Sequence, residues 1–112
     1  MSITTLQRDN QMIIRWEGKI KTQEDFADFS TQFRATIAQH IDTLKSQKWK
    51  LFLINAFPFN TYALGYLLKL KQRDGFDFSI STDHYKIYSI FEQVEFNELF
   101  DIAIEQDPLE VR

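Results

Sequence analysis

The sequence predicts one α/β domain, in which a small mixed β-sheet of four to five strands opens with a hairpin and carries three to four packed helices. Two short β-prone runs near the start of the chain are separated by turn residues, which is typical of a hairpin. From residue 22 onward, helical patterns with apolar residues every three or four positions alternate with short apolar runs. Right-handed crossover connections would place these helices against the sheet.

The hairpin is predicted from β-prone runs at residues 3–6 and 12–16, on either side of Asp9-Asn10. Asp and Asn tolerate the backbone conformations of tight turns. Because side chains alternate along a strand, the second run buries Met12 and Trp16 on one face and leaves the other face at least partly exposed to water.

The first helix is predicted to begin after Thr22, which is a good N-cap. Glu24 and Asp25 occupy its first turn, where the positive end of the helix dipole favours carboxylates, and Lys45 and Lys48 lie near its end. One apolar stripe is expected to face the core along the whole helix. Its members are Phe26, Phe29, Phe33, Ile37, Ile41 and Leu44.

A central strand is predicted at residues 49–54, where a continuous apolar run indicates burial on both faces. Pro58 cannot continue a strand ladder, so a loop is expected there. Asn60 is the expected N-cap of a second helix, and Asp74-Gly75 is expected to end that helix.

The remaining chain is predicted to form a strand at residues 76–81, a third helix from about Asp83, a short strand at residues 99–104 and a helical turn at Asp107-Pro108. Alternating apolar and polar residues indicate the first of these strands. The expected packing face of the third helix comprises Tyr85, Ile87, Tyr88, Ile90, Phe91 and Val94.

Length and composition bound the class of protein. The 112 residues fit one domain, residues 1–112, without room for a second core. The net charge of -3 and the lack of a Lys/Arg cluster argue against a nucleic-acid partner. The absence of cysteine favours a reducing compartment, so a cytoplasmic location is expected. No signal peptide is recognisable and no apolar stretch approaches the ~20 residues that cross a bilayer, so no membrane insertion is expected.

The reactive residue types form no recognisable catalytic pattern. His40 and His84 fall on different predicted helices without a ligand partner at helical spacing, so no metal is expected. Gly18, Gly65 and Gly75 are isolated, which excludes a phosphate-binding glycine loop, and no cofactor is expected. We therefore expect no enzymatic activity. A shallow site that joins a histidine to one of the dispersed carboxylates stays an alternative.

Phe57 and Phe59 flank Pro58 in the loop before the second helix. Half-exposed aromatic side chains on a loop favour an interaction surface, and folding of the loop back onto the core is the equal alternative. Most other aromatic residues fall at helical or strand spacing, where core packing explains them.

The stretch at residues 50–71, KLFLINAFPFNTYALGYLLKLK, resembles the central block of the STAS family, to which the bacterial anti-sigma factor antagonists belong. In that family a buried strand leads through a loop into Asp-Ser-Ser/Thr-Gly-Leu-Gly and a helix, and residues 60–65 align with this hexamer. Residues 13–20 resemble the family's early strand, which ends in Glu-Gly. Residues 87–100 resemble its closing helix and turn. The resemblance covers nearly the whole chain, although each motif is short.

The resemblance implies a sheet with helices on it, no catalysis, and regulation of transcription by a kinase that phosphorylates the hydroxyl residue after the Asp. By position this phosphoacceptor is Thr61. A helix N-terminus offers unpaired N–H groups to a phosphate, and the added charge of about −1.5 to −2 would block a flush contact. Asn60, Tyr62 and Ala63 differ from the family's residues, and an ordinary helix residue without a regulatory role is the alternative for Thr61.

The first functional hypothesis is a docking domain that binds an anti-sigma factor, which is a serine kinase-like protein, in a stoichiometric complex. The second is an accessory subunit of a membrane transporter ATPase, for lipid or anion transport, in which Thr61 is only a contact residue. An exposed, partly apolar helix face also leaves a homodimer open. The expected partner-binding residues are Phe57, Phe59, Asn60, Thr61, Tyr62, Tyr66, Lys69 and Arg73. The last three are expected to be exposed on the second helix.

Overall fold

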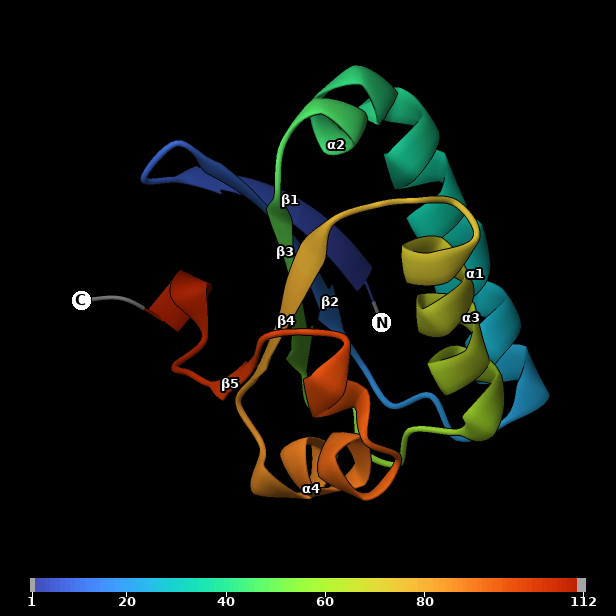
Figure 1. Cartoon of the computed structure of the whole chain (residues 1–112). Helices are drawn as coiled ribbons and strands as arrows, with labels where there is room; N and C mark the ends of the chain where they lie inside the picture. The colour runs from blue at the N-terminus through green and yellow to red at the C-terminus, as the bar shows by residue number, and fades with distance from the viewer. Residues whose placement is uncertain (1, 111–112) are drawn as a thin grey trace.

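The computed structural model describes residues 2–110, so the first residue and the last two of the predicted domain lie outside the described residues. One five-stranded sheet forms its centre (Figure 1). The strands are β1 (Ser2–Arg8), β2 (Gln11–Glu17), β3 (Trp49–Ile54), β4 (Phe78–Thr82) and β5 (Ile102–Ile104). The helices are α1 (Gln23–Gln39), α2 (Ile41–Ser46), α3 (Thr61–Gln72) and α4 (Tyr85–Gln93), with short 3-10 helices η1 (Phe96–Glu98) and η2 (Pro108–Glu110).

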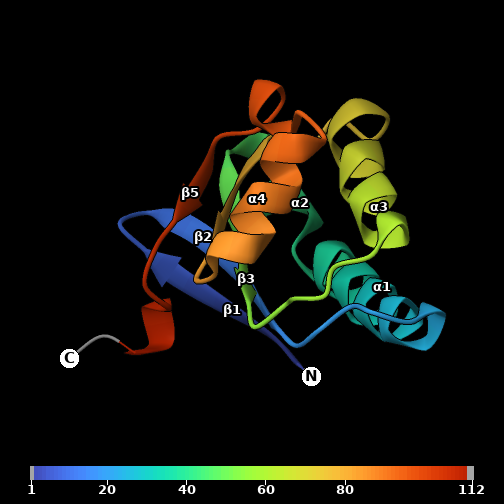
Figure 2. The same cartoon turned by 90° about the horizontal axis from the view of Figure 1, so that it is seen from below.

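The strands lie in the sheet in the order in which they occur in the chain, β1-β2-β3-β4-β5. β1 pairs antiparallel with β2, and the later pairs are parallel. When each right-handed crossover connection leads to the next strand on the same side, all the connecting helices lie on the same face of the sheet. Figures 1 and 2 show α1, α3 and α4 on one side of the sheet and η2 on the other. The predicted α/β class with a mixed sheet and an initial hairpin is therefore confirmed.

The main core lies between the sheet and the helices and is rich in aromatic rings. Trp16 and Trp49 are both 0% exposed. Trp49 stacks on Phe78 with 4.4 Å between ring centroids, and Trp16 meets the edge of Phe29 at 5.0 Å. Edge and offset contacts of this kind add to the free energy of area burial. Side chains from the sheet and from the helices thus hold the two layers together.

Local signals in the sequence set the turn and the helix starts as predicted. Asp9 and Asn10 adopt φ values of 54° and 63°, which the tight hairpin turn requires. Thr22 accepts a hydrogen bond from the backbone N–H of Asp25, and the Asp25 carboxylate accepts one from the backbone N–H of Thr22, forming a capping box. Asn60 caps α3 by accepting a hydrogen bond from the backbone N–H of Ala63.

The predicted first helix is broken at His40, and the prediction that Ile41 faces the core is wrong. His40 has non-helical φ and ψ of −121° and 28°, and Ile41 is 39% exposed. A straight helix from residue 23 to residue 44 would be about 33 Å long, whereas a strand of six residues spans about 20 Å. The break turns α2 back over the sheet, so that Leu44 is buried at 1% exposure.

The packing face of α4 is narrower than predicted. Ile87 and Phe91 are fully buried, whereas Tyr85 is 69% and Val94 is 44% exposed. Tyr85 lies two positions before Ile87, about 200° around the helix, so it faces away from the core, and Val94 is the C-cap that follows the last helical residue.

The last strand is shorter than the predicted residues 99–104 because the chain coils just before it. The backbone N–H of Phe100 donates to the carbonyl of Phe96 at 2.8 Å, which turns both rings into the core at 6% and 4% exposure. β5 begins only after this turn. The predicted helical turn at Asp107-Pro108 is present as η2.

The face of the sheet without helices is less exposed than predicted. Ile13 and Arg15 are each 5% exposed, although they lie opposite the main core. Phe52 and Ile54 of β3 join Ile13 in a small second cluster on this face. Residues 105–110 run along this side of the sheet (Figure 2), and Asp107 binds Arg15 there.

Candidate functional site

The carboxyl ends of the parallel strands form the edge of the molecule where several helices begin. α1, α3 and α4 each follow a strand of the parallel set, so their N-termini gather at this edge (Figures 1 and 2). The backbone N–H of Asn55, just after β3, donates to the Asp83 carboxylate, just before α4, at 3.3 Å. The loops before α3 and α4 are therefore tied together.

The loop between β3 and α3 is held against the chain that precedes α1. The N–H of Ile20 donates to the Pro58 carbonyl, and the N–H of Asn60 donates to the Ile20 carbonyl, each at 2.9 Å. Pro58 follows a cis peptide bond. Phe59 is 6% exposed and packs on Phe91 at 5.6 Å. The expectation that Phe59 is half-exposed is therefore wrong, and the alternative that the loop folds back onto the core is confirmed for this ring.

Asn60 joins the starts of two helices. Its side-chain oxygen caps α3, and its amide nitrogen donates to the carbonyls of Lys21 at 3.4 Å and Thr22 at 3.2 Å. The first turn of α3 contains no acidic residue, in contrast to α1. The positive end of the α3 dipole is therefore not neutralised by a carboxylate of its own first turn.

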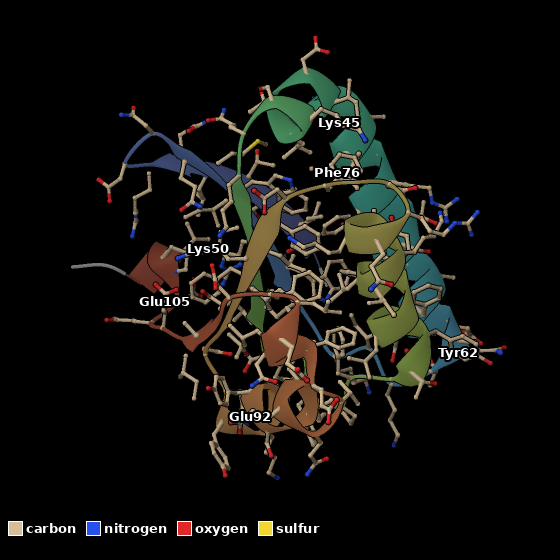
Figure 3. The ribbon with its side chains drawn as sticks, in the orientation of Figure 1. Lys45, Lys50, Tyr62, Phe76, Glu92 and Glu105 are labelled. Atoms are coloured by element: carbon tan, nitrogen blue, oxygen red, sulfur yellow. The ribbon has the colours of Figure 1, made fainter. Side chains whose placement is uncertain are left out.

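Thr61 and Tyr62 open α3 on the surface. Thr61 is exposed, and its hydroxyl has no hydrogen-bond partner among residues 2–110. Tyr62 is 53% exposed, and its hydroxyl accepts a hydrogen bond from the Gln23 side chain at 3.0 Å. Its ring lies 5.9 Å from that of Phe26, and Figure 3 shows it beside the start of α1. Tyr62 is thus held in place by α1 while one side of its ring stays open.

Phe57 lies on the same edge, against the start of α4. It is 40% exposed and stacks on the His84 ring at 6.2 Å with an interplanar angle of 9°. The Lys86 ammonium lies 5.2 Å from the Phe57 ring centroid, within the range of a cation–π contact. Tyr85 stands next to this pair and is 69% exposed.

We call Phe57, Thr61, Tyr62, Tyr85 and Lys86 the helix-start surface. It combines three exposed aromatic rings with a hydroxyl and a cation, and aromatic residues are enriched in protein interfaces. The sequence pattern indicated the first three residues. It missed Tyr85 and Lys86, because Tyr85 was grouped with the apolar residues of the helix. Tyr85 lies about 200° around the helix from the buried Ile87, and this spacing could have indicated its exposure.

Three of the predicted partner-binding residues lie away from this surface. Tyr66 was expected to be exposed, but it is partly buried among Phe26, Phe29 and Phe33 at 6.0 Å from each ring. Burial raises the pKa of the Tyr66 hydroxyl.

Lys69 and Arg73 are exposed as predicted but lie further along α3, roughly 12 Å and 18 Å from Thr61 at 1.5 Å per residue. Lys69 shares the exposed stripe of Thr61 and Gly65, at intervals of four residues. Only a partner that covers the length of α3 would touch Lys69 and Thr61 together.

The structure offers little for metal or acid–base chemistry within residues 2–110. No three His, Cys, Asp or Glu side chains lie close enough to hold a metal ion there. A cavity of about 140 Å³ is lined by His40, without a carboxylate among its described residues. A cavity of about 340 Å³ is lined by Asp101 and Glu105, whose pKa values are lowered by hydrogen bonds from lysines, whereas a general acid needs a raised pKa.

No helix of residues 2–110 has both the length and the apolar character that a membrane span requires. Comparison of the chain with protein-family models, with curated proteins and with solved structures finds no match.

Proposed function

We propose that this chain is a non-catalytic docking domain that binds a protein partner through the helix-start surface and that phosphorylation of Thr61 releases the partner. One observation carries the proposal. Thr61 presents an exposed hydroxyl, without a hydrogen-bond partner among residues 2–110, at the first position of α3, next to the exposed Tyr62. The similarity of residues 50–71 to the central STAS block supports the same position as the phosphoacceptor.

The start of α3 would tolerate a phosphate. The first turn has unpaired backbone N–H groups and no carboxylate, so a negative group there gains from the helix dipole without repulsion from its own turn. A phosphate on Thr61 would add about −1.5 to −2 charges to the helix-start surface. The same modification would therefore stabilise the free domain and weaken a flush complex.

The proposed partner is an anti-sigma factor of the serine-kinase type. Such a partner would both bind the helix-start surface and phosphorylate Thr61, so one surface would serve recognition and regulation. Aromatic residues are enriched in protein interfaces, and tyrosine is among the residue types that contribute most to binding free energies. Phe57 and Tyr62 are the expected anchors, since each is braced by a neighbouring helix.

The test is affinity capture from the source organism with the wild-type chain, Thr61→Asp and Thr31→Asp as baits, followed by mass spectrometry of the partners and of Thr61. Thr31 is exposed in the middle of α1 and serves as the matched control. We expect a kinase-like anti-sigma factor on the wild type and on Thr31→Asp, and its loss from Thr61→Asp. Aspartate at the first position of a helix is favourable, so unfolding would not explain that loss.

The captured partner is then titrated against Phe57→Ala and Tyr62→Ala, with Val94→Ala at the opposite end of α4 as the control. We expect each anchor variant to weaken binding by about tenfold or more, as for central interface residues. Equal binding of the partner to wild type and Thr61→Asp would refute the switch. Capture of transporter ATPase subunits, with Thr61 unmodified, would favour the accessory-subunit alternative.

A further inference from the structure

The face of the sheet opposite the helices carries a groove whose floor is apolar. Ile13, Phe52 and Ile54 form this floor and are 5%, 2% and 2% exposed. Basic side chains stand around it, namely Arg15 from β2 and Lys50 from β3. An apolar floor with cations beside it is complementary to a segment that has apolar and acidic residues.

Residues 105–110, which we call the tail, lie across this groove. The Arg15 guanidinium donates two hydrogen bonds to the Asp107 carboxylate, at 2.8 Å from Nε and 2.5 Å from Nη2. Both side chains are buried, at 6% and 4% exposure. Arg8 donates from Nη2 to the Pro108 carbonyl at 2.9 Å.

A second contact fixes the start of the tail. The Lys50 ammonium binds the Glu105 carboxylate at 2.8 Å, and the Ser81 hydroxyl donates to the same carboxylate oxygen. Figure 3 shows the Lys50 and Glu105 side chains pointing toward one another on the side of the sheet away from the helices. Each acidic side chain of residues 105–107 therefore meets a basic side chain of the sheet.

The tail does not fill the groove. A cavity of about 170 Å³ lies between the hairpin and the tail and is lined by Ile13, Phe52 and Pro108. A second cavity of about 340 Å³ continues toward β5 and shares Lys50 and Glu105 with the first. A larger or differently placed segment therefore has room on this face.

Arg15 gives the groove its specificity. A guanidinium that is 5% exposed is costly unless a carboxylate pairs with it, and a bidentate contact fixes the direction of that carboxylate. Glu17 also contacts Arg15, at 3.1 Å from Nη1, but the Glu17 side chain is 48% exposed, and the Nε and Nη2 edge of the guanidinium binds Asp107. The site is thus built for an acidic side chain that arrives from outside the sheet.

We propose that this groove is a docking site for an acidic, proline-containing segment of a partner protein, and that the tail occupies the site in cis until such a segment displaces it. The site lies on the other side of the sheet from the helices and does not depend on the helix-start surface. A tethered segment acts at an effective concentration of about millimolar. A free segment of equal intrinsic affinity must therefore reach about that concentration, unless the contacts of the tail are weakened.

The probe is the labelled peptide acetyl-Glu-Gln-Asp-Pro-Leu-Glu-amide, which copies the tail, and its binding to the full chain is followed by fluorescence anisotropy. We expect Asp107→Asn to bind the peptide about tenfold or more tightly than wild type, as judged by the peptide concentration at half-saturation. The substitution removes one partner of a buried charge pair and so weakens the contacts of the tail. Asp42→Asn, an exposed carboxylate on α2, is the matched control and should behave as wild type. A peptide with Gln and Asn in place of Glu and Asp should not bind.

Two further variants, each made together with Asp107→Asn, locate the peptide. Arg15→Gln and Lys50→Gln should each weaken peptide binding about tenfold, and Lys50→Gln keeps the test valid if loss of Arg15 unfolds the chain. Amide hydrogen exchange gives the second readout in wild type. The N–H groups of Glu105 and Leu109 are hydrogen-bonded to Thr82 and Asp107, and peptide binding should accelerate their exchange.

The proposal is overturned if wild type and Asp107→Asn bind the peptide equally, or if binding leaves exchange at Glu105 and Leu109 unchanged. It is also overturned if Asp107→Asn dimerises and the dimer excludes the peptide, because the groove would then be an interface between copies of the chain. Thr61→Asp should not alter peptide binding. Failure of the groove proposal can therefore be distinguished from failure of the proposed function of the helix-start surface.

Discussion

The two tryptophans allow a test of what an unpaired buried N–H costs. Trp16 and Trp49 are both 0% exposed and both pack on phenylalanine rings. The Trp16 Nε1 donates to the Gly18 carbonyl at 2.8 Å, whereas the Trp49 Nε1 has no partner within residues 2–110. The pair therefore differs in hydrogen bonding at matched burial.

Replacement of either tryptophan by phenylalanine removes apolar contacts and leaves a cavity of roughly 40 Å³, which costs about 1 kcal/mol at ~24 cal/mol per Å³. In Trp49→Phe, loss of the unpaired N–H returns about 1–3 kcal/mol, so the net change should lie between zero and a gain in stability of about 2 kcal/mol. In Trp16→Phe, loss of the hydrogen bond and of the partner of the Gly18 carbonyl adds about 1–3 kcal/mol. We expect Trp16→Phe to be the less stable variant by about 2 kcal/mol or more.

Urea denaturation followed by circular dichroism measures both free energies of unfolding. The denaturant slopes should agree with that of wild type, because the change in exposed surface is small. The tryptophan that remains in each variant gives an independent fluorescence transition, since the chain has two. A loss of stability in Trp49→Phe as large as that in Trp16→Phe would refute the reasoning.

Asn60→Ala should destabilise the fold by about 1 kcal/mol in urea denaturation, because it removes the cap of α3, and an unchanged midpoint would contradict this role. Gly65→Ala should stabilise by about 0.5–1 kcal/mol, since no atom lies within 4 Å of the added carbon on this helical residue. Gly75→Ala should destabilise by about 1–2 kcal/mol, because its φ of 72° is left-handed, and the opposite order of the two melting temperatures would contradict both expectations. The hydrogen bond from Arg15 lowers the pKa of Asp107 in the folded state. The stability that the Arg15–Asp107 pair gives the fold is therefore fully present above the ordinary aspartate pKa, and it is lost as the pH falls through the folded-state pKa. The difference in melting temperature between wild type and Asp107→Asn should therefore shrink in acid, and a constant difference would contradict the assignment.

The elements that the sequence predicted correctly depend on contacts between near neighbours. The hairpin turn at Asp9-Asn10 and the caps at Thr22 and Asn60 are each fixed by residues within about one turn of chain. The burial of β3 on both faces also follows from its own composition. These features needed no knowledge of the remaining fold.

The features that the sequence could not predict depend on how long the elements are relative to one another. The break at His40 follows from the length of the sheet that α1 covers, which no local pattern contains. The Arg15–Asp107 pair joins residues 92 positions apart, so neither residue stands out in its own segment.

The candidate site could be predicted only in part, because some of its residues are placed by local signals and others by distant segments of the chain. Thr61 and Tyr62 were located because a cap residue places the next two positions on the first turn. Phe57 and Phe59 flank one proline with equal sequence signals, yet one ring meets His84 at the surface and the other meets Phe91 in the core. Which ring turns inward depends on a helix that begins more than twenty residues later.

The agreement between strand order and chain order also governs how the chain can assemble during its synthesis. Each new strand can add to the edge of the sheet that is already present, without waiting for a later segment to fill a gap. Asp107 leaves the ribosome 92 residues after Arg15, which at ~5–20 residues per second is a delay of roughly 5 to 20 s. Asp107 follows Phe52 by 55 residues, so the apolar face around Phe52 stays without this cover for roughly 3 to 11 s of that interval. The arrival of Asp107 therefore ends a period in which the nascent chain is prone to aggregate.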